Sequence, residues 1–322
     1  MPSFEKINYF LRPSKQIERK LIIEALQKLS KGGYFIQDYT YFGMGSIYYA
    51  DFILFHKYLL IDEMICSEKE EIPKRMEFNK PFAFIDLQPD PVSEVIPKLD
   101  RNKKHLVWLD YDYFLDQDKL DDIQGCLYAL APGSILIITV TSDPKHLFSL
   151  LNSTIAKTMT DDQKKREACS LLNDLIGLHF GREIQLKDIS YRDLPHTIGV
   201  AMRNFMNKCV AARSQIKFFQ LFNFVYADGI QMLSIGGIID NSDADEKIKK
   251  SGIYGLGFVT TNDQPVLISV PQLTIREKNW LEKNMVKNPK APEKPDFELD
   301  EKSVENFVKY YRHYPVYNET LV

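Results

Sequence analysis

The first part of the chain alternates between short apolar runs and segments with helical periodicity. Apolar residues recur at helical spacing over residues 15–30, and Gly32-Gly33 ends this predicted helix. Strands are predicted at 39–42, 64–67, 82–85, 105–109 and 134–140, with helices at 47–58 and 118–130. Because these strands are apolar enough to be buried on both faces, the alternation predicts a parallel α/β sheet.

The pattern changes after the fifth predicted strand. Residues 144–213 contain no convincing strand and are helical in composition. Two β-rich runs follow, at 217–226 and 231–239, and Ala227-Asp228-Gly229 between them is a strong hairpin signal. We therefore expect an α/β fold with a doubly wound, mostly parallel seven-stranded sheet that ends in an antiparallel hairpin and carries a helical insertion.

This pattern also divides the chain into three parts. We expect an N-terminal helical segment at 1–33, an α/β domain at 34–270 that contains the insertion 144–213, and a C-terminal linker and helix at 271–322. The amphipathic pattern of residues 301–314 predicts the C-terminal helix.

Composition and charge narrow the class of protein. The chain has 322 residues, of which 44% are hydrophobic and 26% charged, as in ordinary soluble globular proteins. The formal net charge of -3 gives no positive field over the whole molecule, so any nucleic-acid contact must be local. Residues 194–227 contain no acid, and cations interleaved with aromatic residues make 203–217 a candidate surface for a nucleotide or nucleic acid.

Cysteine, histidine and apolar patterns exclude several other classes. The two closest cysteines, Cys169 and Cys209, are 40 residues apart, which excludes a zinc knuckle and a dense disulfide framework. The histidines form no HExxH motif, so we predict no metal site. No apolar run approaches the ~20 residues of a membrane span, and the N-terminus lacks the apolar core of a signal peptide. We expect a cytoplasmic protein with no membrane partner.

Small and acidic residues follow the predicted strands. Gly43-Met44-Gly45-Ser46 follows the first strand, and Glu68, Asp86 and Asp110 follow the next three. The carboxyl ends of parallel strands form the ligand crevice of such sheets. The glycines would let the backbone approach a ligand, and the acids suit ribose hydroxyls and an exocyclic amine. A nucleoside-containing cofactor is therefore predicted.

These residues resemble the class I S-adenosylmethionine-dependent methyltransferase fold over about residues 34–240. The resemblance rests on Gly43 and Gly45, on Glu68, on Asp86-Leu87, on the segment 108–113, on Pro132-Gly133-Ser134 and on the hairpin. It implies S-adenosylmethionine as the cofactor, held by Phe42, Gly43, Met44, Gly45, Ser46, Glu68, Asp86, Leu87, Asp110 and Tyr111. The phrases LRPSKQIERK, YFGMGSIYYADF and VWLDYDYFLD are similar to bacterial proteins described as O-methyltransferases, a similarity that names no acceptor.

The segment Asp110-Tyr111-Asp112-Tyr113 is the candidate catalytic element. Methyl transfer is an in-line displacement that needs an aligned acceptor and sometimes a base, for which Asp110 and Asp112 are candidates. Tyr113 would form one side of the acceptor site. No prolines follow the acid as in the Asn/Asp-Pro-Pro-Tyr motif of amino-methylating enzymes, so no amine-specific chemistry is implied. The similarity to O-methyltransferases favours O-methylation.

Lys15 and Arg19 lie one helical turn apart and share a face of the first helix. They are candidates for binding the cofactor carboxylate or an anionic substrate, and a solvated helix face is the alternative.

Two other functions stay open. Tyr41 stands where the resembling motif usually has an acid, and two of its usual three glycines are present. These departures favour a non-catalytic, methyltransferase-like module that binds a nucleotide or a protein partner, including a second copy of the chain. A nucleotide-dependent oxidoreductase is a further alternative, but Tyr48 occupies the third glycine position of a dinucleotide fingerprint.

Overall fold

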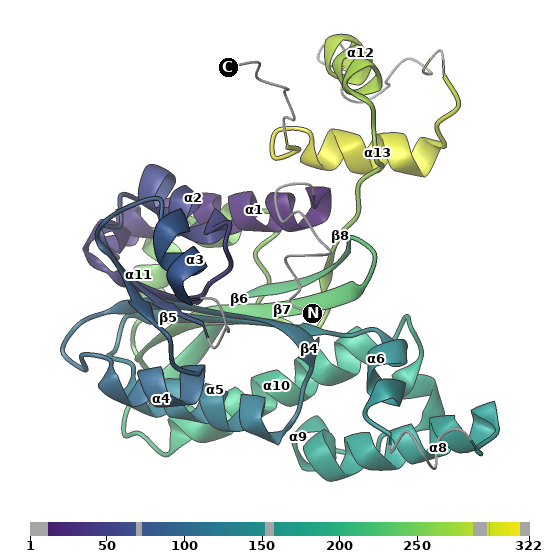
Figure 1. The fold of residues 1–322 in the computed structure, drawn as a ribbon, viewed down its shortest axis with the longest axis horizontal. Helices are drawn as coiled ribbons and strands as arrows, with labels where there is room; N and C mark the ends of the chain where they lie inside the picture. The colour runs from purple at the N-terminus through teal and green to yellow at the C-terminus, as the bar shows by residue number, and fades with distance from the viewer. Residues whose placement is uncertain (1–11, 69–72, 152–157, 286–294, 296, 316–322) are drawn as a thin grey trace.

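One eight-stranded sheet organises the protein (Figure 1). The computed structural model describes residues 12–68, 73–151, 158–285, 295 and 297–315. The strands are β1 (Thr40–Met44), β2 (Glu63–Ser67), β3 (Ile85–Gln88), β4 (His105–Phe114), β5 (Ser134–Thr141), β6 (Ile216–Ala227), β7 (Gln231–Asn241) and β8 (Val266–Ile268). Their order across the sheet is β3-β2-β1-β4-β5-β7-β6-β8.

Strand directions confirm the predicted architecture. Strands β1 to β5 pair parallel with one another, whereas β7 pairs antiparallel with both β5 and β6. The predicted number of seven strands is one too small, because β8 pairs parallel with the outer side of β6. Strand β8 has three residues between Pro265 and Ser269, too few for its alternation to stand out from the sequence.

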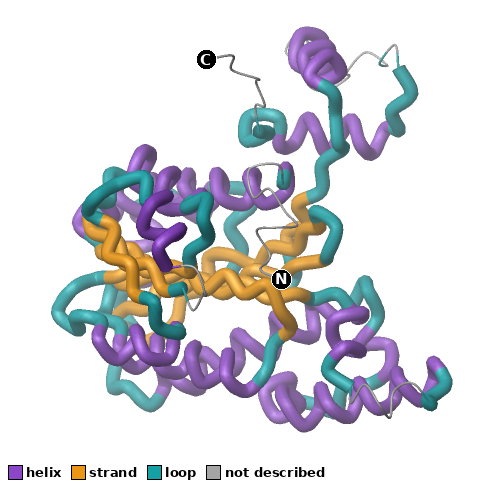
Figure 2. The backbone as a smooth tube through the Cα atoms, viewed as in Figure 1, coloured by secondary structure: helices purple, strands orange, loops and turns teal. Residues whose placement is uncertain are grey.

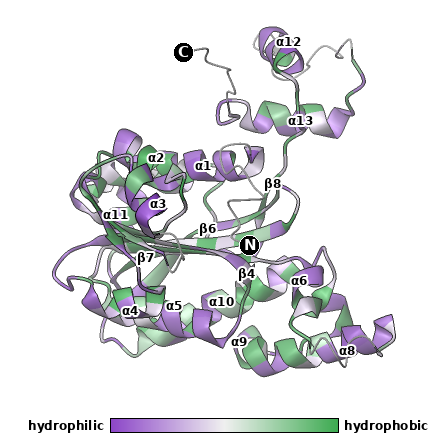
Figure 3. Cartoon of the chain, in the orientation of Figure 1, coloured by the Kyte–Doolittle hydropathy of each residue, from purple (hydrophilic) through white to green (hydrophobic). Residues whose placement is uncertain are grey.

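Helices cover both faces of the sheet, as a doubly wound fold requires (Figures 1 and 2). One face carries α1 (Pro13–Leu29), α2 (Ala50–Leu59), α3 (Pro73–Asn79) and α11 (Asp245–Lys250). The other carries α4 (Val92–Val95), α5 (Gln117–Ala129) and α10 (Leu194–Ala211). Each face has its own hydrophobic cluster. Hydrophilic and hydrophobic residues alternate along these helices in Figure 3, as expected of helices with one side buried.

The predicted helix at 15–30 is α1, and its apolar stripe is buried. Ile17, Leu21, Ile22 and Leu26 are at most 1% exposed and pack in the cluster on the α1 face of the sheet. The C-terminal helices α12 (Ile275–Met285) and α13 (Glu301–Tyr310) lie beyond α1, and α13 confirms the predicted C-terminal helix (Figure 1). Its buried residues Val304, Phe307 and Tyr310 belong to the same cluster.

Three strands end elsewhere than the sequence predicts. Strand β1 continues through Gly43 and Met44, and β4 continues past Asp110 to Phe114 across an irregularity in its pairing with β5. Strand β3 begins only at Ile85, so Asp86 lies inside it and not after it. The aromatic residues that suggested an earlier strand, Phe82 and Phe84, stack on each other at 5.2 Å and pack against a histidine of α2.

The insertion between β5 and β6 is helical as predicted. It contains α6 (Pro144–Ser149), α8 (Asp161–Leu172), a π-helical turn (Asn173–Gly177), α9 (Leu178–Phe180), a 3-10 turn (Leu186–Ile189) and α10. The division of the chain at residues 33, 143, 213 and 270 stays a prediction. Residues 1–11 of the N-terminal segment and 286–294 of the predicted linker lie outside the described residues.

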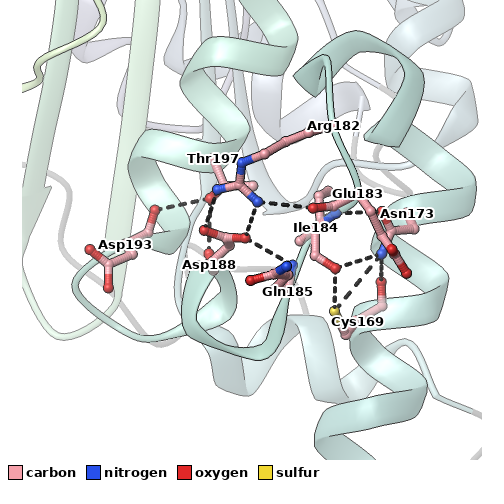
Figure 4. Close-up of polar contacts among 9 residues, drawn as sticks. All are labelled: Cys169, Asn173, Arg182, Glu183, Ile184, Gln185, Asp188, Asp193 and Thr197. Carbon is pink, nitrogen blue, oxygen red and sulfur yellow. Dashed lines mark hydrogen bonds and ion pairs between the residues drawn. The ribbon is translucent and has the colours of Figure 1, made fainter.

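Polar contacts join the parts of this insertion (Figure 4). Arg182 forms a two-pronged ion pair with Asp188, at 2.7 and 2.8 Å. The side chain of Asn173 exchanges two hydrogen bonds with the backbone of Ile184, and the Cys169 thiol donates to the same carbonyl at 3.0 Å. These contacts tie the loop after α9 to α8 and to the turn before α10.

Candidate functional site

A cavity of about 270 Å³ lies at the carboxyl ends of β1, β2 and β4. Three chain segments line it: the loop and helix start between Met44 and Phe52, Glu68 after β2, and residues 110–113 of β4. Arg19 of α1 completes the lining. The predicted site residues that the structure brings together here are Arg19, Met44, Gly45, Ser46, Glu68, Asp110, Tyr111, Asp112 and Tyr113.

Four other predicted cofactor residues do not line this cavity. Phe42 is fully buried in the cluster on the α5 side of the sheet. Gly43 is an inner residue of β1 and pairs with β2 on one side and β4 on the other. Asp86 is exposed and accepts a hydrogen bond of 2.7 Å from the side chain of Gln88. Leu87 packs against the core cluster on the α1 side. The prediction that Asp86 follows its strand is wrong, because Asp86 is the second residue of β3, two residues before the carboxyl end of that strand.

The glycines of the β1 turn are needed for close packing. A Cβ atom on Gly45 would lie 2.3 Å from the Cys66 sulfur, and one on Gly43 would lie 2.3 Å from the hydroxyl of Tyr41. Neither glycine has a positive φ angle, whereas Tyr49, the residue before α2, has φ 45°. The fold thus has its own steric requirement for glycine at these two positions, and the predicted role in ligand approach stays a prediction.

Lys15 is buried in the protein, and its ammonium contacts protein groups on several sides. Its Nζ lies 2.8 Å from Asp110, 2.9 Å from Glu18 and 3.1 Å from the Tyr226 hydroxyl, to which it donates. The ammonium also lies 4.4 Å from the centre of the Trp108 ring. Burial alone would lower the pKa of Lys15, but the two carboxylates outweigh it and raise this pKa. The solvated helix face considered for Lys15 is therefore wrong.

The same lysine holds Asp110 in its ionised form. Burial alone would raise the pKa of Asp110, yet the charges of Lys15 and Arg19 hold it below its usual range. The Asp110 side chain is 19% exposed and borders the cavity, so its charge acts there. Tyr111 contributes differently, because its side chain lies on the α5 side of the sheet. There its hydroxyl donates a hydrogen bond of 2.7 Å to the carboxylate of Asp122.

Arg19 forms a buried ion pair with Asp51, in the first turn of α2. Burial alone would lower the pKa of Arg19, but the charge and hydrogen bond of Asp51 outweigh the effect of burial and raise this pKa. Both side chains line the cavity, and the pair joins α1 to α2 at its edge.

Sequence reasoning missed Asp51, Glu18 and Tyr226, although two of them leave a signal. Asp51 is a single carboxylate within the otherwise apolar run 47–55. Glu18 has helical spacing from Ile22, so it falls on the buried stripe of α1, where an ionisable residue needs a partner. Tyr226 has no such signal, because the end of a buried β-strand commonly carries an aromatic residue.

A second cavity, of about 440 Å³, lies at the same edge of the sheet over β6 and β8. Its lining is largely apolar and includes Val225, Leu267 and Val270, with Tyr191 and Arg192 contributed by the insertion. Tyr226 also lines this cavity, and its hydroxyl contacts Lys15, whose ammonium contacts Asp110 of the first cavity. The two cavities are therefore separated by this short chain of contacts.

The candidate nucleic-acid stretch 203–217 has internal partners for its arginines. Arg203 pairs with Asp263 at 2.7 Å, and Arg213 donates to the carbonyl of Leu127. Lys208 and Lys217 are exposed. The two arginines of this stretch therefore contact protein groups from other segments.

Two features are absent from the part of the chain that the structure describes. No cluster of three histidine, cysteine or acidic side chains there is arranged to hold a metal ion. None of the helices in the described part of the chain has the length and apolar character needed to cross a membrane.

Comparison with known proteins decides the family. The model of a family described as "Putative O-methyltransferase" matches residues 7–322. The chain belongs to this family. No protein with a curated description matches this family member in sequence.

Solved methyltransferase structures are similar to this family member at low identity. Trm1 from Pyrococcus horikoshii, in complex with S-adenosyl-L-methionine, has a TM-score of 0.40 and 11% identity over 75% of this chain and 58% of its own. The chain therefore spans less than two thirds of Trm1. The O-methyltransferase TomG from Streptomyces achromogenes, in complex with the same compound, has a TM-score of 0.34 and 12% identity over 66% and 79% of the two chains. The family assignment rests on the sequence match.

Proposed function

We propose that this protein is an S-adenosylmethionine-dependent methyltransferase that transfers the methyl group to an oxygen of its acceptor. The observation that carries the proposal is the meeting of Glu68, Asp110 and Asp112 with the β1 turn in one cavity at the carboxyl edge of the sheet. This edge is where ligands bind in open α/β sheets. The family match supports the same activity.

The chemistry of the lining residues fits the cofactor. Glu68, directly after β2, offers a carboxylate that would accept hydrogen bonds from ribose hydroxyls. Arg19 is the cation of the lining and would attract the cofactor carboxylate, while Asp110 would attract its positive groups. When bound, S-adenosylmethionine supplies an electrophilic methyl group on a sulfonium. The β1 turn residues Met44 and Ser46 would form the floor beneath it.

The two aspartates of β4 would have different roles. Asp110 is paired with Lys15 and has a lowered pKa, so it is a poor base and instead contributes negative charge to the cavity. Asp112 lines the same cavity two residues further along, and we assign it the removal of the acceptor proton. Tyr113 is 70% exposed at this edge and would contact the acceptor.

The second cavity would bind a separate ligand, because the buried contacts of Lys15 with Tyr226 and Asp110 lie between it and the first cavity. Its apolar lining favours an apolar molecule, and Arg192 at its side favours one with an anionic group. A nucleic-acid acceptor has little support, because the arginines of residues 203–217 have protein partners.

The rival function is a methyltransferase-like module without catalysis. The observation that favours it is the pairing of Lys15 with Asp110 and of Arg19 with Asp51, which occupies charged groups that a ligand would use. Titration calorimetry with S-adenosylmethionine and S-adenosylhomocysteine separates the two functions. Binding of both, followed by transfer of a labelled methyl group to a hydroxyl compound, supports the enzyme. A folded protein that binds neither supports the module.

A further inference from the structure

The cofactor cavity borders a group of charged side chains that carries an excess of negative charge. The group consists of the cation Lys15 and the carboxylates Glu18 and Asp110. One cation faces two carboxylates, so one negative charge remains when all three are ionised. Most of these side chains are buried or half-buried, which weakens screening by solvent.

Glu18 is the member of this group that lies farthest inside. Its side chain is 0% exposed, and it does not line the cavity. Its carboxylate contacts the Lys15 ammonium at 2.9 Å, and the same ammonium contacts Asp110 at 2.8 Å. One positive charge is therefore shared between two carboxylates. Without the charge of Glu18, Lys15 would neutralise Asp110, and the cavity would be less negative.

We propose that Glu18 is a specificity-determining residue that, acting through Lys15 and Asp110, makes the cavity prefer the cationic sulfonium cofactor over its neutral thioether product. The inference rests on the proposed function. S-adenosylmethionine carries one positive charge more than S-adenosylhomocysteine, so a negative cavity favours the first. Such a preference would assist release of the product after transfer.

Electrostatics gives the expected size of the effect. Two unit charges about 10 Å apart, at an effective dielectric constant of about 20, interact strongly enough to change an affinity by about five- to twentyfold, and an effect of this order is expected on the affinity ratio. A buried carboxylate of this kind is costly to keep ionised, and burial, opposed in part by Lys15, raises the pKa of Glu18. A bound cation would offset the cost of keeping Glu18 ionised. If position 18 served only for packing, an apolar residue there would suffice.

The test compares affinities for the two compounds. Titration calorimetry of the full chain gives the affinity ratio of S-adenosylmethionine to S-adenosylhomocysteine. In Glu18→Gln the ratio should fall about five- to twentyfold, mainly through weaker binding of S-adenosylmethionine. Glu24→Gln is the matched control, because Glu24 lies on the same helix and pairs with His313, away from the cavity. Its ratio should equal that of the wild type.

A second pair of variants keeps the proposal testable if Glu18→Gln does not fold. Lys15→Met and Lys15→Met/Glu18→Gln differ only in the charge of residue 18. The affinity ratio of the double variant should be about five- to twentyfold lower than that of Lys15→Met. An unchanged ratio in Glu18→Gln, or an equal loss of both affinities, overturns the inference while leaving the proposed function standing. A wild-type protein that binds neither compound overturns the proposed function, and the inference with it.

Discussion

The carboxylate of Asp228, in the turn between β6 and β7, accepts a hydrogen bond of 2.9 Å from the backbone N–H of Lys15 at the start of α1. Its other oxygen accepts from the Ser14 N–H at 3.1 Å. The residue that precedes the helix, Arg12, provides no side-chain cap. A residue more than 200 positions away therefore caps α1, and it fixes the backbone that carries Lys15 next to Asp110.

Replacement of this cap should destabilise the protein. Asp228→Ala leaves two backbone donors without their acceptor, and we expect the free energy of unfolding to fall by about 1–2 kcal/mol. Asp228→Asn, which keeps an oxygen acceptor, should lose less. Urea denaturation measures both variants. Equal stability of Asp228→Ala and the wild type would show that water replaces this cap at no cost.

Gly45 should be required for folding before it is required for binding. The methyl group of Gly45→Ala would lie 2.3 Å from the Cys66 sulfur, so we expect destabilisation of about 1–3 kcal/mol. Addition of Cys66→Ala should recover part of this loss, because it removes the atom that clashes. Thermal unfolding of the single and double variants measures the recovery. If Gly45→Ala keeps full stability and loses only cofactor affinity, the predicted role of ligand approach is correct.

Glu68 should bind the cofactor, and Asp86 should not. Loss of a charged acceptor from the cavity in Glu68→Ala should weaken S-adenosylhomocysteine binding by about ten- to hundredfold. Asp86→Ala is the control, because this exposed side chain contacts Gln88 and does not line the cavity. Calorimetry on both variants gives the comparison. A larger loss in Asp86→Ala than in Glu68→Ala would move the ribose site to β3.

Asp110→Asn and Asp112→Asn should separate binding from catalysis. Asp110→Asn removes the charge that Lys15 pairs with, so we expect lower affinity for S-adenosylmethionine. Asp112→Asn should keep this affinity and lower the turnover rate by about 10²–10⁴-fold, as expected for loss of a general base. Calorimetry measures the first effect, and methyl transfer to an identified acceptor measures the second. Full turnover in Asp112→Asn would exclude it as the base.

Cofactor binding should depend on pH through Glu18. Burial raises the pKa of Glu18, so its titration falls above the ordinary glutamate value of ~4.3. Below the raised pKa the carboxyl is protonated, and a bound cation must displace that proton. Affinity for S-adenosylmethionine should therefore rise with pH until Glu18 is ionised in the free protein. The charged and titratable groups around Glu18 are Lys15 and Arg19 of α1, Asp110 of β4 and Tyr226 of β6, and Ser234 of β7 is a polar neighbour.

Proton release on binding measures this linkage directly. Titrations of S-adenosylmethionine in buffers of different ionisation enthalpy should show protons released near the raised pKa. Glu18→Gln should show none, and S-adenosylhomocysteine should release fewer. The same pH dependence in Glu18→Gln and the wild type would assign the titration to another group.

The sequence alone predicts the sheet and its closing hairpin, because these features depend on local patterns. The buried strand Ser134–Thr141 is a continuous apolar run, and the Asp-Gly turn after β6 requires the positive φ of 106° that Gly229 adopts. Glu68 directly follows β2 as predicted, since a charged residue marks the end of that apolar run. Three residues of β8 were too few to leave such a pattern.

Only the tertiary structure decides which charges meet at the site. Lys15 and Asp110 are 95 positions apart, and their contact depends on how α1 crosses the strand ends and on the cap from Asp228. No local periodicity carries that information, so the same lysine was consistent with a solvated helix face. Side-chain packing likewise decides that Asp86 is exposed within β3. The sequence determines where acids follow strands, and long-range packing decides which of them are paired, buried or turned toward the cavity.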